Sequence, residues 1–408
     1  MRLLPYSLLG LIGLTIIACQ PAVENAPSLT VSNSSALDFQ DSPIIIPMAK
    51  INSLATSLGE GEVLAPHDED GALIPFQYDD LDRDGKVDEL LFLVDLSAGK
   101  EKVITFKAVA ASQDFPFRTQ VHLGKKSDQV IQELAEATRL DTWDNKITQS
   151  QYQFEGPGWE NDRVGFRNYF DRRNGIDIFG KIQSALVLDQ VGVGSLQNYH
   201  ELKEWGMDIL KVGSSLGAGS AALWYQDSLI RLSSPEADFQ LLCEGPLRST
   251  FQLGFRGVDL GDKKIDVEQL IYIYAGTYAY ESSLSLSDAE EIQVVSGIVD
   301  LHQLPSHSLS DESSEVLYTY GYQTENQDSL GMALMAAQVL EPVAVDTDSL
   351  AGEIPDSYAL LLSPPTVRYR FYAAWEPSNP QFASQAGFEA YLKSEMGRFA
   401  KSPTLTWQ

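Results

Sequence analysis

Cysteine is almost absent from this sequence. Its 408 residues include two cysteines, Cys19 and Cys243. An exported chain of this length can bury a large core without disulfides. Cys243 lies in the apolar run FQLLCEG, which favours a buried, inert thiol over a nucleophile. No zinc-ligand spacing and no G-x-S-x-G motif occurs either, so two common catalytic designs are excluded.

Basic residues are also scarce. Lysine and arginine number 29 against 57 aspartates and glutamates, for a net charge of −28. Such a surface repels phosphate backbones, so we expect no nucleic-acid partner. The hydrophobic content of 44% is ample for a packed core. Against this acidic background, the four arginines within residues 156–181, GPGWENDRVGFRNYFDRRNGIDIFGK, stand out as a local basic cluster.

No apolar run is long enough to span a bilayer. The run Leu8–Ala18 follows one arginine and ends at Cys19, which predicts a lipoprotein signal peptide over 1–18 with lipidation at Cys19. The alternative is an ordinary secretory signal that is cleaved elsewhere. Residues 19–40 are polar and aperiodic, which predicts a flexible tether. We therefore expect a lipid-anchored protein of the bacterial cell envelope.

Helical periodicity is rare, and short apolar or alternating runs separated by turn residues predict an all-β, antiparallel sandwich. Two segments favour helices, 127–137 and 384–400. The runs divide into an N-terminal β-module over 41–120 and a larger domain over 121–408. A single continuous domain over 41–408 is the alternative.

The turn DDLDRDGKVDE resembles a calcium loop. Its candidate ligands are the aspartates at alternating positions and one further along: Asp80, Asp82, Asp84 and Asp88. A glycine follows at the position where such loops turn sharply, but Leu91 stands where the bidentate glutamate is expected. The alternative is a plain acidic hairpin turn. Any calcium here is expected to be structural, and we expect no cofactor to be required for catalysis.

Residues 163–171 alternate in polarity, which predicts a strand with one buried face. The opposite face would carry Arg163, Arg167 and Tyr169 in a line. Guanidinium groups suit a carboxylate or sulfate because they offer paired donors in a fixed geometry. The alternative is a solvated strand with ordinary ion pairs.

The preceding loop combines an indole with carboxylates and an amide. Trp159 is followed by Glu160, Asn161 and Asp162. An indole can stack on the apolar face of a sugar ring while the polar side chains bind its hydroxyls. The alternative is a core tryptophan.

A second polar segment, YHELKEWGMDILK, contains one of the five histidines. His200 is followed by Trp205, Asp208 and Lys211. Histidine transfers protons near neutral pH, and a nearby carboxylate can fix its tautomer. The alternative is an incidental loop histidine.

Four stretches together resemble a family of bacterial exported proteins known as domain of unknown function 4861. They are PFQYDDLDRDGKVDELLFLVDL, the 156–181 stretch, YHELKEWGMDILKVGSSLGAG and FYAAWEPSNPQFASQAGFEAYL. The resemblance implies a galactose-mutarotase-like β-supersandwich and a role in polysaccharide breakdown, often of uronate-containing glycans. The positions that match the family are Trp159, Glu160, Asp162, Arg163, Arg167, Tyr169, His200, Trp205, Asp208 and Lys211. Arg83 departs from the glycine expected in the aspartate loop and weakens the calcium hypothesis.

The leading hypothesis is an enzyme acting on uronic-acid-containing oligosaccharides, in its sharpest form a lyase. Arg163 and Arg167 would neutralise the uronate carboxylate, and Tyr169 or His200 would move the proton. Two alternatives remain. A hydrolase or epimerase would use a carboxylate pair such as Glu160 and Asp208, and a glycan-binding lipoprotein would need no proton-transfer group.

Overall fold

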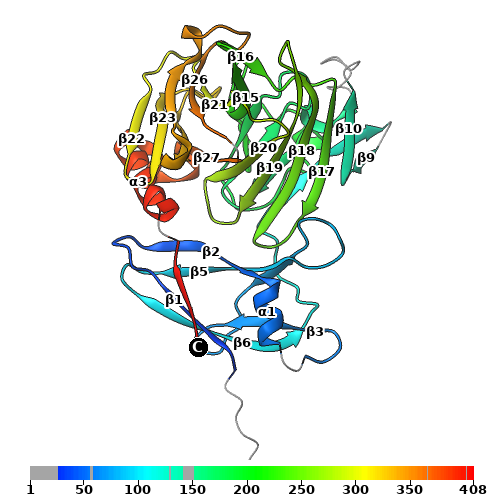
Figure 1. Cartoon of the computed structure of the whole chain (residues 1–408), viewed down its shortest axis with the longest axis vertical. Helices are drawn as coiled ribbons and strands as arrows, with labels where there is room; N and C mark the ends of the chain where they lie inside the picture. The colour runs from blue at the N-terminus through cyan, green and yellow to red at the C-terminus, as the bar shows by residue number, and fades with distance from the viewer. Residues whose placement is uncertain (1–25, 56–57, 128–129, 141–150, 365, 401) are drawn as a thin grey trace, which may run out of the picture.

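The computed structural model describes residues 26–55, 58–127, 130–140, 151–364, 366–400 and 402–408. They form a small N-terminal module and a larger β-sandwich joined at one end (Figure 1). The predicted signal peptide, the lipidation site Cys19 and the first part of the predicted tether lie outside these residues. Within the described ranges, no helix combines the length and apolarity needed to cross a membrane.

The N-terminal module packs two antiparallel sheets around its own core. The first sheet has the order β28(Thr404–Trp407), β1(Ser28–Ser32), β6(Glu101–Ala110), β3(Glu62–His67). The second has the order β2(Phe39–Pro47), β5(Glu89–Leu96), β4(Phe76–Asp79), with α1(Met48–Leu54) following β2. Alternate residues of the strands, such as Ile44, Phe92 and Phe106, meet in this core.

Two sequence-based boundaries are wrong. The stretch expected to be a flexible tether contains β1, which pairs with β6 on one side and β28 on the other. Leu29 and Val31 are fully buried there, so this stretch has an apolar face to pack. The chain also returns at its end, because β28 belongs to the N-terminal module rather than to the domain expected over 121–408 (Figure 1).

A nine-stranded antiparallel sheet forms one layer of the large domain. Its order is β10(Glu136–Leu140), β17(Glu236–Cys243), β18(Arg248–Asp259), β19(Lys264–Tyr274), β20(Ala279–Leu286), β27(Thr366–Trp375), β24(Ser329–Ala337), β23(Ser314–Tyr322), β22(His307–Ser310). In β19 every second residue from Ile265 to Ile273 is buried. This alternation places one face of the sheet on the core and leaves the other more open.

Two five-stranded sheets form the opposite layer. One has the order β14(Gly206–Asp208), β13(Ile176–Lys181), β12(Val164–Asn168), β11(Gly158–Asn161), β7(Thr119–His122). The other has the order β16(Ser228–Arg231), β15(Ala218–Tyr225), β21(Gln293–Val299), β26(Ser357–Leu362), β25(Val343–Asp346). Phe166 and Leu223 of these sheets share one hydrophobic cluster with Phe251 and Phe371 of the nine-stranded sheet. The predicted all-β sandwich of antiparallel sheets is thereby confirmed.

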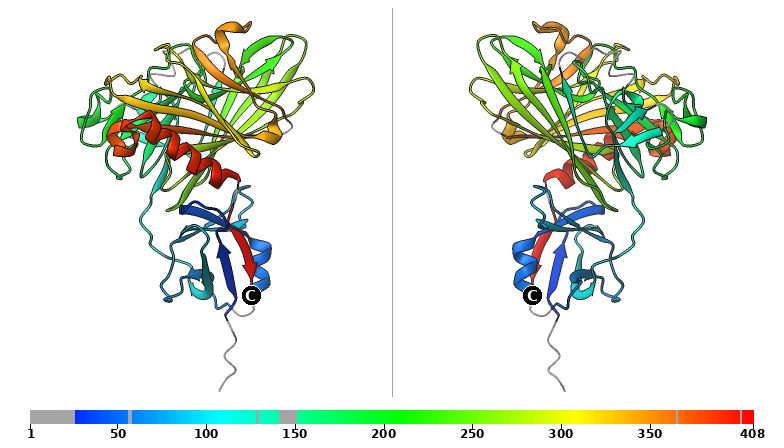
Figure 2. Two further views of the ribbon diagram at one scale, coloured as in Figure 1. Left: turned by 90° about the vertical axis from the view of Figure 1, so that its left-hand side faces the viewer. Right: turned by 90° about the vertical axis from the view of Figure 1, so that its right-hand side faces the viewer.

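The predicted C-terminal helix is present as α3(Gln385–Ala400), and it covers part of the outer face of the nine-stranded sheet (Figure 2). Phe388 and Leu392 are fully buried against β24, whose residues are therefore buried on both faces. Short 3-10 helices of the described chain are η1(Gln153–Glu155), η2(Gly194–Leu196), η3(Gln338–Leu340), η4(Thr347–Ser349), η5(Glu376–Ser378) and η6(Pro380–Ala383).

The helix predicted over 127–137 is wrong. The chain forms a small hairpin there from β8(Gly124–Ser127) and β9(Val130–Glu133), followed by β10. β10 extends the nine-stranded sheet by pairing along the edge of β17. Pairing with an available sheet edge outweighs the modest helix propensity of such a short segment.

Candidate functional site

Arg167 organises a cluster of charged groups on the outer face of the sheet that contains β12. Its guanidinium donates to Asp177 on the adjacent β13 at 2.7 Å and to Asp208 on β14 at 2.8 Å. All three side chains are almost fully buried. The pairing of Arg167 with Asp177 in register, and of Phe179 with Asp208, brings the three charges together. A buried cation held by two buried carboxylates is a strongly bound arrangement.

Two tyrosine hydroxyls also accept hydrogen bonds from this guanidinium. Arg167 donates to the hydroxyl oxygen of Tyr169 at 2.9 Å and of Tyr199 at 3.2 Å, while the Tyr169 hydroxyl donates to Asp177 at 2.9 Å. Burial, reinforced by the charge of Asp177, raises the pKa of Tyr169. Tyr169 is therefore a neutral donor. The Arg167 guanidinium is bound by groups inside the protein. The prediction that it contacts a substrate carboxylate is therefore wrong.

His200 lies at the solvent-exposed edge of this cluster. Its side chain is 61% exposed, and its Nδ1 lies 3.3 Å from the Oδ2 of the buried Asp208. The backbone N–H of Asp208 donates to the Tyr199 carbonyl at 2.9 Å, which fixes the loop that carries His200 over β14. When Nδ1 carries the proton and points toward Asp208, Nε2 is the unprotonated nitrogen and can accept a proton.

The electrostatics bring the pKa values of His200 and Asp208 toward each other. Partial burial and the charge of Arg167 lower the pKa of His200. Burial and the neighbouring Asp177 raise the pKa of Asp208 well above its usual range. An imidazole that is neutral at pH 7, next to a carboxyl group of raised pKa, is suited to transfer protons.

Arg173 is a partly exposed arginine beside this cluster. Its guanidinium lies 4.0 Å from the centre of the Tyr169 ring and pairs with Asp171 at 2.7 Å and Glu155 at 3.0 Å. Its side chain is 29% exposed. The charge of Glu155 also acts on His200, so Arg173 and His200 share one electrostatic environment.

The two tryptophans predicted to bind sugar are core residues. Trp159 is fully buried, with its rings 5.2 Å from Phe251 and 5.3 Å from Tyr280. Trp205 is buried beside Phe179, with the ring centres 6.1 Å apart. Neither indole has a free face on which a sugar ring could stack. The prediction that these two tryptophans bind sugar is therefore wrong.

Glu160 also has a structural position. Its carboxylate is fully buried, forms a short ion pair with Lys181, and accepts from the backbone N–H groups of Val187 and Leu188. Burial raises the pKa of Glu160, although Lys181 opposes the shift. These contacts attach the segment around residues 187–188 to the sheet. The predicted role of Glu160 as a catalytic acid is therefore corrected, because no substrate can reach its carboxylate.

Of the remaining predicted residues, Asn161 ends β11 and the others lie outside the strands. Asn161 is buried and accepts from the N–H of Arg163, and Asp162 pairs with Arg118 at 2.9 Å. Arg163 and Lys211 are exposed. Arg163 precedes the first residue of β12, whereas the Arg167 guanidinium is buried and bound to Asp177 and Asp208. Because protein groups enclose Arg167, the two guanidiniums do not both face a substrate carboxylate, and that part of the prediction is wrong.

The site predicted from the sequence does not include Asp177 and Tyr199, two members of the cluster, or the neighbouring Arg173. Asp177 lies within the 156–181 stretch, but only the strand register shows that it faces Arg167. Tyr199 directly precedes His200, and its ring lies 4.5 Å from the imidazole. An aspartate ten residues after an arginine, on the next strand of a hairpin, was the available signal.

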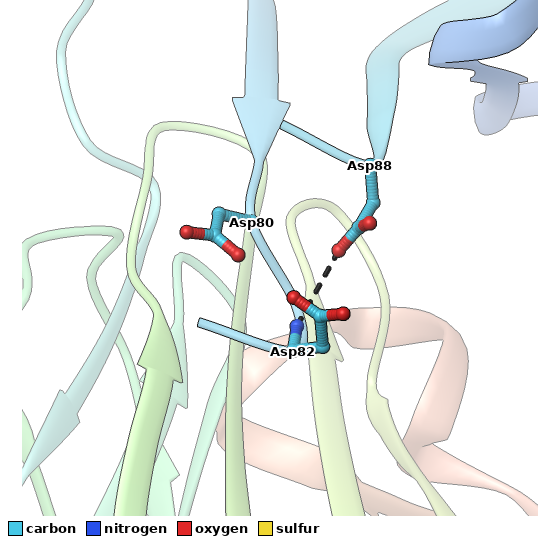
Figure 3. A group of neighbouring side chains, drawn as sticks. All are labelled: Asp80, Asp82 and Asp88. Carbon is cyan, nitrogen blue, oxygen red and sulfur yellow. Dashed lines mark hydrogen bonds between the residues drawn. The ribbon is translucent and has the colours of Figure 1, made fainter. Parts of the chain in front are cut away.

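The aspartate loop forms the turn between β4 and β5. Carboxylate oxygens of Asp80, Asp82 and Asp88 lie within 4.8 Å of one another (Figure 3). Asp84 instead pairs with Lys86 at 2.7 Å, so it does not join the predicted set. Oxygen ligands from three carboxylates suit calcium, which stays a prediction for this turn. Cys243 is half-buried, and burial raises the pKa of its thiol to about 12, so it is not a nucleophile at neutral pH.

The fold and the site define an all-β protein with a buried arginine–dicarboxylate cluster beneath an exposed histidine. The chain belongs to the family described as domain of unknown function 4861 (DUF4861), whose model matches residues 31–404. The resemblance noted in the sequence is thereby confirmed. An uncharacterized protein of Formosa agariphila is 23% identical over 357 residues, covering 79% of this chain and 78% of that protein.

Two solved structures from Enterococcus faecalis are similar at 7% sequence identity. One is an α-mannosidase, with a TM-score of 0.45 over 94% of this chain and 46% of that chain. The other is a protein in glycosyl hydrolase family 38, with a TM-score of 0.47 over 95% of this chain and 48% of that chain. The present chain thus spans about half the length of these two proteins.

Proposed function

We propose that this protein is a carbohydrate-active enzyme in which His200 transfers a proton to or from a glycan. The contact between the exposed imidazole and the buried Asp208 carries the proposal. Asp208 orients the ring, Arg167 holds Asp208, and the lowered pKa of His200 keeps Nε2 available as a base. A glycan substrate, often one containing uronic acid, is what the family resemblance implies.

The sharpest form of this proposal is a lyase. His200 Nε2 would remove the proton at C5 of a uronate, the C4–O bond would break, and a C4=C5 double bond would form. The imidazolium would then return its proton to the departing oxygen, so no other reactant is needed. Arg173 replaces Arg163 and Arg167 as the group that faces the substrate carboxylate, because its guanidinium remains partly exposed beside Tyr169.

The test uses the soluble form that begins at Gln20 and a panel of pectin, alginate and glucuronate oligosaccharides. Ultraviolet absorbance reports the double bond, and reducing ends report any cleavage. We expect His200→Ala to lower both signals about a hundredfold or more, and Tyr169→Phe to lower them less. His302→Ala, at an exposed histidine outside the cluster, is the matched control.

Each outcome separates one alternative. Reducing ends without absorbance would identify a hydrolase. Binding without either signal, unchanged by His200→Ala, would identify a glycan-binding protein and would refute the enzyme. Equal activity in the wild type and His200→Ala would place the chemistry elsewhere.

We also propose that the protein is anchored by a lipid on Cys19 at the bacterial cell envelope. The apolar segment that ends in IIAC supports this proposal. Mass spectrometry of the protein from membranes should find the lipid on Cys19, and Cys19→Ala should release the protein into the soluble fraction.

A further inference from the structure

A cavity of about 210 Å³ lies at the junction between the N-terminal module and the nine-stranded sheet. Its sheet side is formed by Tyr272 of β19, Ser283 of β20 and Arg368 of β27. Ile45 and Leu81 of the N-terminal module line its other side. None of these five residues belongs to the cluster around His200.

The walls of this cavity are already fixed. Arg248 of β18 is almost fully buried and pairs with Asp79 and, at 2.7 Å, with Glu89 of the N-terminal module. The Gln77 side chain donates to the Arg248 carbonyl at 2.8 Å and accepts from its N–H. A ligand would therefore enter a preformed site and would not have to order the two modules.

Several polar groups that line the cavity keep binding capacity. Within the described residues, the hydroxyls of Tyr272 and Ser283 have no hydrogen-bond partner. Arg368 pairs with Glu281 yet leaves 57% of its side chain exposed. Each of the two hydroxyls can therefore donate to and accept from a ligand.

We propose that this cavity is a second carbohydrate site, which binds a single sugar residue of a glycan. The half-buried Tyr272 ring offers an apolar face, and hydroxyl and guanidinium groups surround it, as a polyhydroxylated ring requires. The volume is below the roughly 300 Å³ of sites for drug-sized ligands, which fits one ring rather than a chain.

The charges of the cavity suit an acidic or a neutral sugar and select against a cation. Glu281 already pairs with both Arg368 and Arg370, so its carboxylate is neutralised. Arg368 is the charged group most exposed to an incoming ligand. A uronate carboxylate would form a paired contact with its guanidinium, whereas a neutral sugar would use hydroxyl oxygens.

The test measures binding directly, and only its choice of sugars rests on the proposed function. Uronic-acid disaccharides and neutral disaccharides are titrated calorimetrically into the chain from Gln20 carrying His200→Ala, so that turnover plays no part. We expect Arg368→Gln and Tyr272→Ala each to weaken binding about tenfold or more. Arg370 still pairs with Glu281 in Arg368→Gln, and thermal unfolding checks that both variants fold.

Arg256→Gln is the matched control, because Arg256 is another partly exposed arginine of the nine-stranded sheet, paired with Asp238 at 2.9 Å. The affinity of the Arg256→Gln variant for the sugars should be unchanged. Absence of binding by every sugar, or equal affinities in all variants, would overturn the proposed site. Binding of the uronic-acid disaccharides alone would show that the site recognises the carboxylate. Binding of the neutral disaccharides would show that it recognises the hydroxyls. Because His200 is absent throughout, binding that depends on Arg368 would stand even if the proposed catalysis failed.

Discussion

His200 differs from the other members of the Arg167 cluster because solvent reaches it. Arg167, Asp177 and Asp208 are shielded from water, so their mutual arrangement is set before any substrate arrives. A preorganised, buried set of charges holds its geometry at no cost when the reaction begins. In the proposed mechanism His200 acts at the surface under the influence of these charges, because its ring is exposed and its Nδ1 lies 3.3 Å from the Oδ2 of Asp208.

The first prediction at this scale concerns pH. In the proposed mechanism the neutral imidazole is the base, and partial burial and Arg167 lower the pKa of His200. The plot of activity against pH should therefore have an ascending limb whose midpoint lies below the ordinary histidine pKa of about 6.5. Activity should stay high at neutral pH. The measurement is kcat/KM against pH.

Glu325 provides a control for that assignment. Its carboxylate is exposed, and its charge raises the pKa of His200. Glu325→Gln should shift the limb to lower pH and leave the plateau unchanged. A limb that stays in place, or that persists in His200→Ala, would show that another group titrates.

The sequence predicted part of this site. Arg167, Tyr169, His200 and Asp208 were all selected, and the structure brings all four together. Trp159 lies in β11 with its indole in the main core against Phe251 and Tyr280, whereas the polar residues beside it indicate a loop. The period-two pattern of residues 163–171 identifies two faces of a strand without showing that both are covered. β12 is buried along its entire length, since the segment that contains Trp205 covers the outer face of its sheet.

At the scale of elements, the Glu160–Lys181 pair joins β11 to β13 and to the segment around residues 187–188. Lys181→Met should lower the free energy of unfolding by about 3–5 kcal/mol, because it leaves a buried carboxylate without its partner. Glu160→Gln combined with Lys181→Met should cost clearly less, since no buried charge remains. Urea unfolding of the single and double variants measures the difference. A double variant that is less stable than Lys181→Met would contradict this account.

The turn between β4 and β5 gives a second prediction for an element. If calcium binds Asp80, Asp82 and Asp88, added calcium should raise the unfolding temperature of the wild type by mass action. Asp80→Asn should remove most of that rise. Asp84→Asn should retain it, because Asp84 pairs with Lys86 instead. An equal response in the two variants would exclude this carboxylate set.

Long-range pairing explains which elements the sequence missed. Periodicity identifies α3 because Phe388, Leu392 and Met396, which are buried, recur at helical spacing along one face. It could not find that residues 130–133 and 136–140 are strands, because their partners, β8 and β17, decide the outcome. β28 is a similar case, since four residues near the end of the chain carry little signal until β1 is in place.

At the scale of the whole molecule, ion pairs connect the two modules. Arg118 pairs with Asp41 of the N-terminal module and with Asp162 of the sandwich, both at 2.9 Å. Arg248 of the sandwich pairs with Asp79 and Glu89 of the N-terminal module. Guanidinium–carboxylate pairs form only within a narrow range of geometries. These pairs therefore set the orientation of the two modules as well as the strength of their contact.

The chain itself provides a further connection, because α3 packs on the sandwich and β28 then joins the N-terminal module. Trp407 of β28 lies with its ring 5.3 Å from that of Phe106, and the Nζ of Lys50 lies 4.7 Å from the indole. Trp407→Ala should lower the stability of the N-terminal module by about 2–3 kcal/mol, as expected for truncating a partly buried aromatic residue. Differential scanning calorimetry should show this as an earlier unfolding transition of that module. Leu405→Ala, at an exposed position of the same strand, should leave the transition in place, and equal losses in the two variants would mean that Trp407 does not hold the module.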